Sequence, residues 1–267
     1  MKRIILIFKT MFSRKWLSAT FIVILGIVLM VRLGLWQLDR LELRRAENAA
    51  LLTVLEAEPL DLAADFLPDD VTELKDRQID TAGEFDVENQ VVLILKSWQG
   101  KPGVHLITPF VLGDGNTAVL VDLGWIPQSE YEAGHLAQYV DTKQTQLAGT
   151  AALSQKLSRY GNAAAQPSGP QNEVYRVDVS QLQPQMPYEL LPFYVLAEPI
   201  ADNVDLPYRL EPGIDLSEGP HLSYALQWFL FAAILGIGCI VYVNQGLNKE
   251  TDNEENVADA SGNQFPV

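Results

Sequence analysis

Two long apolar blocks, one near each end of the chain, limit its possible folds more than any other feature. The first covers residues 17–31 without a charge and continues past Arg32 to Trp36. The second covers residues 224–243, again without a charge. About twenty apolar residues in a helix cross the hydrocarbon of a bilayer, and an arginine one turn from the end can extend its side chain to the headgroups. Each block is therefore predicted to be a transmembrane helix.

The charges before the first block predict how the helices cross the membrane. The basic residues there, with no acidic residue among them, are Lys2, Arg3, Lys9, Arg14 and Lys15. The positive-inside rule places such a segment in the cytoplasm, and a second crossing returns the C-terminus there. A cleaved signal peptide is the rival interpretation. The apolar run exceeds the usual signal core, however, and residues 35–37 offer no small-x-small cleavage site.

The segment between the blocks is predicted to be rich in β-structure. Helical leucine spacing continues beyond the first block, with no helix breaker before Pro59. Strand-like alternation then marks residues 78–85, 90–97, 104–112, 117–123, 144–152 and 193–200. Residues 113–116 (GDGN) favour a hairpin, residues 163–172 a polar loop, and residues 179–186 a short helix. These strands predict an antiparallel sheet or barrel.

The predicted fold is a membrane protein of the α+β class, in which two transmembrane helices flank an antiparallel β-rich outer domain. The C-terminal tail, residues 244–267, is polar and acidic, which is typical of a disordered segment. The predicted boundaries are a basic cytoplasmic N-terminus at 1–16, transmembrane helix 1 at 17–38, the extracytoplasmic domain at 39–219, transmembrane helix 2 at 220–243 and an acidic cytoplasmic tail at 244–267.

Composition excludes several classes of function. The formal net charge of −15 leaves no basic stripe for nucleic acid. Cys239 has no cysteine partner, and three histidines without a cysteine cluster argue against structural zinc. No hydrolase, metalloprotease or nucleotide-binding motif occurs, and the adjacent Asp69 and Asp70 are better explained as a solvated loop. His105 and His135 are assigned surface or core roles, so the chain is not expected to be an enzyme.

The outer ends of the two blocks are the candidate site. On a helix, Trp36, Arg40 and Arg44 recur every four residues and share a face. An interfacial tryptophan with arginines on lipid phosphates explains that pattern equally well. In the second block, His221, Tyr224 and Trp228 fall at i, i+3 and i+7.

The second pattern has two interpretations. In the first, His221 lies at the water-membrane boundary above an aromatic residue and is the axial ligand of a haem that lies partly in the bilayer. The arginines of the neighbouring helix then neutralise the haem propionates. An interfacial polar residue without a ligand is the alternative.

Three strings together resemble the Surfeit locus protein 1 (SURF1) family. They are residues 34–40 (GLWQLDR), 124–127 (GWIP) and 221–229 (HLSYALQWF), of which the last is the most specific. The family usually has an Asn-Arg-like pair before Gly-Trp-x-Pro, where this chain has Asp122 and Leu123. The resemblance therefore transfers no positive charge to that position.

The resemblance implies an assembly factor for cytochrome c oxidase that acts as a haem a chaperone in respiratory chain biogenesis. It implies transient haem a binding, with His221 as the iron ligand. The implied partners are the catalytic subunit of the oxidase, the haem a synthesis machinery and the lipid bilayer. The supporting candidates for the cofactor site are Trp36, Gln37, Arg40, Arg44, Tyr224 and Trp228.

Two other functions stay open at this point. The chain could be a platform without haem that recruits oxidase subunits, or a membrane-tethered hydrolase that uses the outer carboxylates. The hydrolase lacks a convergent acid-base set. The short segment before the first block favours a bacterial plasma membrane over the alternative, a mitochondrial inner membrane.

Overall fold

The computed structural model describes residues 2–134, 136–156, 171–199, 205–209 and 213–262, with side chains from Arg3 to Lys249. The chain forms two compact units. One contains residues 1–49 and 216–267, and the other contains residues 50–215.

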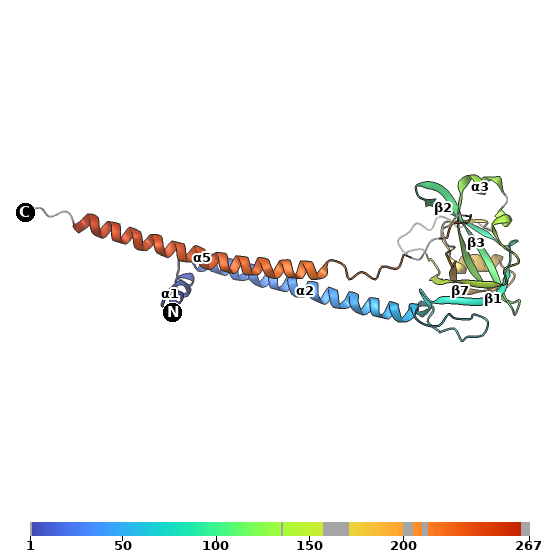
Figure 1. Ribbon diagram of the computed structural model, residues 1–267, viewed down its shortest axis with the longest axis horizontal. Helices are drawn as coiled ribbons and strands as arrows, with labels where there is room; N and C mark the ends of the chain where they lie inside the picture. Colours follow the sequence, from blue (N-terminus) through green and yellow to red (C-terminus); the bar gives the residue numbers. More distant parts are fainter. Residues whose placement is uncertain (1, 135, 157–170, 200–204, 210–212, 263–267) are drawn as a thin grey trace, which may run out of the picture. The chain divides into compact units, whose positions relative to one another are not determined.

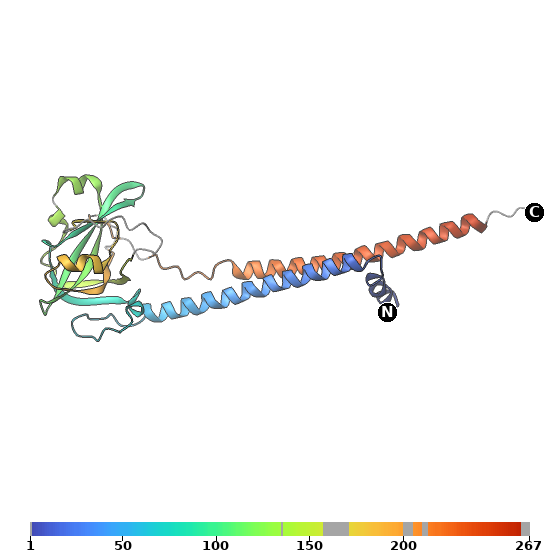
Figure 2. The same ribbon diagram turned by 180° about the vertical axis from the view of Figure 1, so that it is seen from behind.

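The first unit is helical. It is built from α1 (Lys2–Met11), α2 (Leu17–Leu55) as far as Ala49, and α5 (His221–Gly262). Figures 1 and 2 both show α2 and α5 side by side along their apolar stretches. Both helices are long and apolar enough to cross a membrane, judged by length and composition. The sequence thus predicted both long helices, including the extension of the first one beyond the apolar block.

Small residues let α2 and α5 approach closely. A Cβ added at Gly34 would lie 2.6 Å from the Phe229 ring, and one at Gly26 would lie 3.1 Å from Leu235. Ala225 and Ala232 of α5 are buried as well. Close backbone approach over small residues is the usual way in which apolar helices pack without a hydrophobic driving force between them.

The two ends of the helical unit differ from the prediction. The tail was predicted to be disordered from residue 244, but α5 continues to Gly262, so that prediction is wrong over 244–262. A formed helix adds each further residue at low cost, and this segment contains no proline. The helix α1 was not predicted, because a ten-residue helix is marginal by itself and depends on packing.

The second unit is a curved sheet that closes on itself (Figure 1). Its strands lie in the order β1-β5-β7-β4-β3-β2-β6, and β1 pairs with β3 as well. At this closing pair, Gly83 lies opposite Leu112, and a Cβ at Gly83 would clash with the Val111 carbonyl. The strands are β1 (Gln78–Phe85), β2 (Val91–Trp98), β3 (Lys101–Leu112), β4 (Thr117–Pro127), β5 (Gln146–Leu153), β6 (Glu173–Val174) and β7 (Glu189–Ala197).

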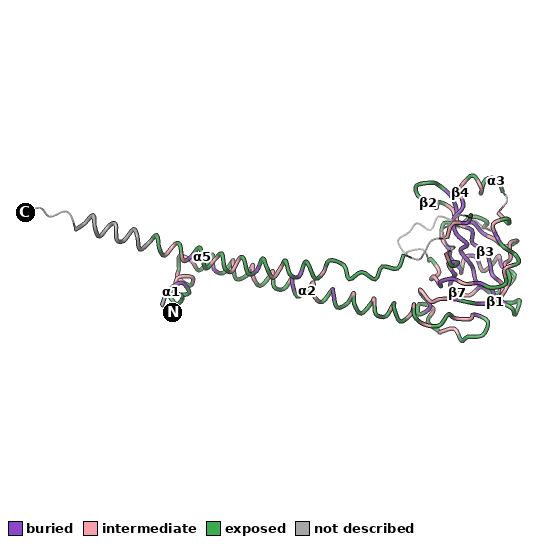
Figure 3. Tube along the Cα trace, in the orientation of Figure 1, coloured by how far each residue is buried: buried purple, intermediate pink, exposed green. Residues whose placement is uncertain are grey.

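Alternation along the strands builds a core on each side of the sheet. In β4, Val119 and Val121 join Phe110 and Phe193 in one cluster, while Leu120 joins the other. Figure 3 shows this unit as mostly buried along its strands. The short helices are η1 (Val71–Leu74), α3 (Gln128–Ala133), η2 (Leu136–Tyr139), α4 (Val179–Leu182) and η3 (Gln183–Gln185).

The predicted strands are present, but the prediction that all neighbouring strands are antiparallel is wrong. Six predicted strands correspond to β1–β5 and β7, residues 113–116 form the predicted hairpin, and α4 with η3 form the predicted short helix. The sheet is mixed rather than antiparallel, because β4 pairs with β7 and β2 with β6 in parallel. Long connections between these partners permit parallel pairing, and no local pattern reveals it. The predicted loop at 163–172 lies mostly outside the described residues.

The Gly-Trp-Ile-Pro string has a structural role in the sheet. It lies within β4, which continues through it to Pro127. Two residues of β4, Leu123 and Gly124, lie opposite one residue of β3, and Gly124 has φ +113. This is a β-bulge that only glycine accommodates easily. Beyond it, Trp125 is 1% exposed and stacks against both Trp98 and Tyr208, which also contact each other.

Candidate functional site

A cleft of about 400 Å³ lies between α2 and the first turn of α5. Both walls belong to the helical unit. Trp36 and Tyr224 are about half exposed, so the cleft opens outward between two aromatic side chains. Its lining residues are Trp36, Gln37, Arg40, Leu43, Arg44, Glu47, Pro220, His221 and Tyr224.

One hydrogen bond joins the two walls and defines the state of the imidazole. Nδ1 of His221 lies 2.8 Å from Oε1 of Gln37. A glutamine carbonyl oxygen only accepts hydrogen bonds, so Nδ1 carries the proton and donates it. In a neutral imidazole, the lone pair is then on Nε2. His221 therefore presents a fixed ring with one nitrogen available to a metal.

The start of α5 keeps Nε2 accessible. Gly219 has φ +68, a conformation that favours glycine, and a Cβ there would lie 3.6 Å from Nε2. Pro220 follows, and its carbonyl accepts hydrogen bonds from the Tyr224 amide at 3.1 Å and the Ser223 hydroxyl at 2.7 Å. The turn thus places the imidazole at the end of the helix, with a glycine rather than a larger residue next to Nε2.

Two arginines add positive charge to the same cleft. The Arg40 guanidinium carbon lies 5.8 Å from the centre of the Trp36 ring, a cation–π distance. Arg44 donates from Nε to the Ser217 carbonyl at 3.1 Å, and Glu47 lies 3.7 Å from its Nη1. The cleft therefore combines an imidazole, apolar aromatic faces, two cations and the carboxylate of Glu47. With one positive charge in excess, it suits a ligand that is apolar in one part and anionic in another.

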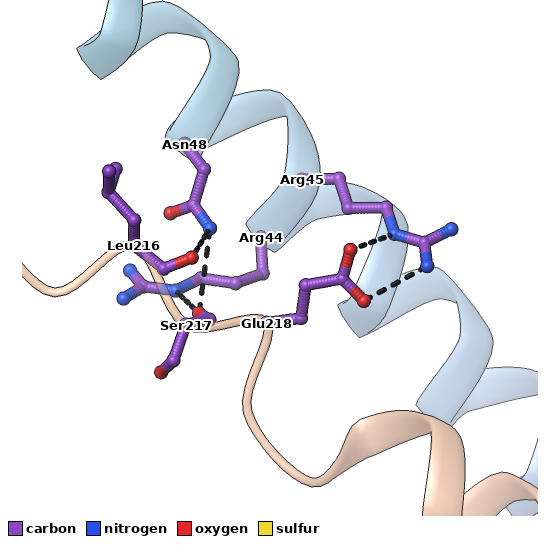
Figure 4. A network of polar contacts seen from close by, with 6 residues as sticks. All are labelled: Arg44, Arg45, Asn48, Leu216, Ser217 and Glu218. Carbon is purple, nitrogen blue, oxygen red and sulfur yellow. Dashed lines mark hydrogen bonds and ion pairs between the residues drawn. The ribbon is translucent and has the colours of Figure 1, made fainter.

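Hydrogen bonds from Arg45 and Asn48 hold residues 216–218 against α2, and we call this set of contacts the clasp (Figure 4). Arg45 donates to both carboxylate oxygens of Glu218, from Nε at 2.8 Å and from Nη2 at 2.9 Å. Asn48 donates to the Leu216 carbonyl at 2.6 Å. These contacts fix residues 216–218 against α2 three residues before His221, so they help to set the position of the imidazole.

Both charges of the clasp are stabilised by their contact. The bidentate bond to Arg45 lowers the pKa of Glu218 and raises the pKa of Arg45. Because folding lowers the pKa of Glu218, its ion pair stabilises the folded protein fully at any pH above the ordinary glutamate pKa. This stabilisation is lost as the pH falls through the lowered pKa of the folded protein. The clasp is thus intact at neutral pH and weakens only in acid.

Reversing one charge of the clasp is expected to loosen the start of α5. In an Arg45→Glu variant, amide hydrogen exchange of residues 216–220 should become about two- to five-fold faster, the range for an exposed ion pair. The double variant R45E/E218R restores opposite charges and should recover the slow exchange. Equal exchange in all three proteins would show that the clasp does not hold this segment.

The structure brings most predicted site residues together. Trp36, Gln37, Arg40, Arg44, His221 and Tyr224 all line the cleft. Trp228 does not line it; this residue lies two turns further along α5 and packs edge-on against Phe231, with ring centres 6.2 Å apart. Its role as a cofactor contact stays a prediction.

Two of the other residues considered from the sequence, His105 and Asp70, have structural contacts. Nδ1 of His105 lies 2.9 Å from Asp122, in a largely buried pair beside the β-bulge. Asp70 caps η1 by accepting the Thr72 amide at 2.9 Å, which supports a loop role for the aspartate pair. His135 lies outside the described residues. Among the described residues, no group of three His, Cys, Asp or Glu side chains is placed to hold a metal ion.

The sequence pattern did not reveal the clasp, nor Leu43 and Glu47 of the cleft wall. Arg45, Asn48 and Glu218 were not singled out, although Arg45 and Asn48 are three residues apart and so share a helix face. Nothing in their pattern identified Glu218 as the partner, because that contact joins residues 173 positions apart.

Comparison with known proteins places the chain in a family. Residues 24–233 match the SURF1 family, a range that contains every residue lining the cleft. The chain belongs to the SURF1 family. The resemblance of the three strings is thereby confirmed.

Relatives of this SURF1-family chain occur in bacteria and eukaryotes. A SURF1-like protein of Rickettsia felis is 25% identical over 233 residues, which cover 85% of this chain and 97% of the relative. The cytochrome oxidase assembly protein SHY1 of Saccharomyces cerevisiae is 32% identical over 98 residues, covering 37% of this chain and 25% of that protein. Surfeit locus protein 1 of Gallus gallus is 24% identical over 139 residues, covering 46% and 44%.

Proposed function

We propose that this chain is a membrane-anchored assembly factor for cytochrome c oxidase. It binds haem a in the cleft between α2 and α5 and aids its delivery to the catalytic subunit, without catalysing a reaction itself. Family membership and the assembly role named for the yeast relative support the assembly role of this chain. The orientation of His221, with Nδ1 bonded to Gln37 and Nε2 accessible, is the observation that carries the haem role.

The spacing of aromatic residues supports membrane insertion of both helices. Trp16 and Tyr242 pack edge-on at one level, with ring centres 5.5 Å apart, and Trp36 and Tyr224 line the cleft at another. Twenty residues separate the two tryptophans, which is about 30 Å of helix and the thickness of the hydrocarbon. Tryptophan and tyrosine concentrate at the two membrane interfaces. The cleft then lies at a lipid-water boundary.

The exposed apolar surface between these levels also supports membrane insertion. Phe21, Ile22 and Ile237 are 66%, 67% and 63% exposed, and similar residues continue along both helices. A soluble protein rarely exposes a contiguous apolar surface of this length. The basic residues before α2 support an orientation with that end on the cytoplasmic side of a bacterial plasma membrane, or on the matrix side if the membrane is the mitochondrial inner membrane.

The residues of the cleft fit the chemistry of haem a, the cargo of the proposed function. Haem a offers an iron that accepts an imidazole nitrogen, an apolar ring and tail, and two carboxylates. Nε2 of His221 would ligate the iron, the Trp36 and Tyr224 rings would pack on the macrocycle, and Arg40 and Arg44 would pair with the carboxylates. Because the cleft offers a single imidazole, ligation from one side leaves the haem transferable.

Gln37 is expected to matter by fixing the tautomer of His221. A Gln37→Leu variant keeps the side-chain volume and loses the acceptor for Nδ1. Partners that orient a ligating histidine typically contribute about 10–100-fold to metal affinity, so haem a affinity should fall by that factor. A Gln37→Glu variant keeps an acceptor and should retain much more affinity than the leucine variant. Equal affinity in the leucine variant and the wild type would contradict this role.

Deleting the gene tests the assembly function. Oxidase activity and the haem a absorbance of the membranes should fall together, while the genes of the oxidase subunits remain intact. The wild-type chain should restore both signals. If a His221→Ala variant also restores both signals, the chain acts as a platform without haem. If oxidase activity is unchanged after deletion, the assembly role itself is wrong.

A further inference from the structure

The amphipathic helix α1 is held in a fixed orientation beside the end of the apolar part of α5. It does not continue the line of α2 but turns aside next to α5 (Figures 1 and 2). Arg3 donates from Nε to Oδ1 of Asn244 at 3.0 Å and from Nη2 to Oδ1 of Asn248 at 2.8 Å. Ile7 is 8% exposed. One face of α1 is therefore occupied.

The remaining faces of α1 are not equivalent. At about 100° per residue, the Ile4, Ile5 and Phe8 side chains fall within an arc of about 100°, and Phe12 directly follows the last residue of α1. Their exposed fractions are 61%, 67%, 52% and 61%. The arc lies away from the face that Arg3 and Ile7 turn to α5. A short helix with an aromatic and aliphatic stripe this exposed needs an apolar environment outside the protein.

The charges around the stripe indicate what that environment is. Lys9 borders the stripe, and Arg14 and Lys15 follow it immediately. Thr20 at the start of α2 donates to the Met11 carbonyl at 2.8 Å, which ties the end of α1 to the level of Trp16 and Tyr242. Apolar residues bordered by cations at the entry of a membrane span match the boundary of an anionic leaflet, where acyl chains lie beside negative headgroups.

We propose that α1 is a membrane-surface helix that binds anionic phospholipid on the side where both termini lie. This rests on the proposed membrane placement of α2 and α5. The stripe of Ile4, Ile5, Phe8 and Phe12 enters the acyl boundary, and Lys9, Arg14 and Lys15 meet the headgroups. The hydrogen bonds of Arg3 join this anchor to α5 and keep both helices in register at that leaflet.

Depth-dependent fluorescence quenching tests the proposal in the full chain. Cys239 is replaced by serine, and an environment-sensitive dye is attached to single cysteines introduced as Phe8→Cys or Leu6→Cys. These two positions are similarly exposed, at 52% and 50%, but lie on opposite sides of α1. A third protein carries Leu25→Cys, on the exposed surface of the apolar part of α2. The proteins are reconstituted into vesicles with phosphatidylglycerol or phosphatidylcholine alone, each containing brominated lipid.

The proposal predicts several-fold stronger quenching at Phe8 than at Leu6 by lipid brominated near the headgroup. It also predicts a blue-shifted Phe8 emission that is stronger in phosphatidylglycerol vesicles. Leu25 should be quenched by bromines deep in the acyl chain. If Leu25 is quenched but Phe8 behaves like Leu6, α1 does not bind the membrane surface, while the proposed membrane placement stands. If Leu25 escapes quenching as well, both proposals are wrong.

Discussion

Purified protein in which alanine replaces His221 is expected to lose haem a. The imidazole is the only side chain lining the cleft that can donate a nitrogen lone pair to iron, since the cations there donate hydrogens only. Loss of an orienting partner costs about 10–100-fold in metal affinity, so loss of the ligand itself should cost at least about 100-fold. Titration of the apoprotein in detergent with haem a, followed by the Soret absorbance, measures the difference.

The neighbouring residue gives a matched control for His221. Leu222 is 47% exposed and does not line the cleft, so Leu222→Ala should bind haem a like the wild type. Both variants truncate a side chain in the same turn of α5 and differ in whether that side chain faces the cleft. Indistinguishable titrations of the His221→Ala protein and the wild type would show that the histidine does not ligate the iron.

A large side chain at Gly34, in the contact between α2 and α5, is expected to disrupt the cleft although Gly34 does not line it. Gly34 is buried, and even a single added carbon there would lie 2.6 Å from the Phe229 ring. A Gly34→Leu variant must push the helices apart one turn below Gln37, which separates Gln37 from His221. Overpacking a fitted interior costs roughly 1–3 kcal/mol. We expect a lower midpoint of thermal unfolding in detergent and weaker haem a binding.

Gly238 provides the control for the same substitution. It lies in the apolar part of α5, and a Cβ added there meets nothing within 4 Å. Gly238→Leu should therefore leave both the unfolding midpoint and the haem a affinity near their wild-type values. A Gly34→Leu protein that matches it in both measurements would refute the close packing of the two helices as the basis of the cleft.

The sequence predicted the parts of this protein that depend on local pattern. Both long helices follow from uninterrupted apolar residues, and the hairpin at 113–116 follows from four turn-forming residues between two strands. The face shared by Trp36, Arg40 and Arg44 follows from helical spacing alone. These features required no knowledge of which distant segments meet.

Features that depend on distant partners were not predictable. The parallel pairing of β4 with β7 joins segments separated by about sixty residues, and period-two alternation is the same in parallel and antiparallel strands. The clasp of Arg45 with Glu218 and the bond of Gln37 to His221 likewise join the two ends of the chain. The helix α1 forms where Arg3 meets Asn244 and Asn248, which its own sequence does not reveal.

The most direct measurement is the nitrogen ligation of the iron in purified protein loaded with haem a. The chain has three histidines, so uniform ¹⁵N labelling of histidine makes a pulsed electron paramagnetic resonance spectrum simple to assign. We expect one imidazole ¹⁵N strongly coupled to the ferric iron, and loss of that coupling in a His221→Gln protein. No coupled imidazole in the wild type, or an unchanged coupling in the variant, would contradict the assignment of His221 as the haem ligand.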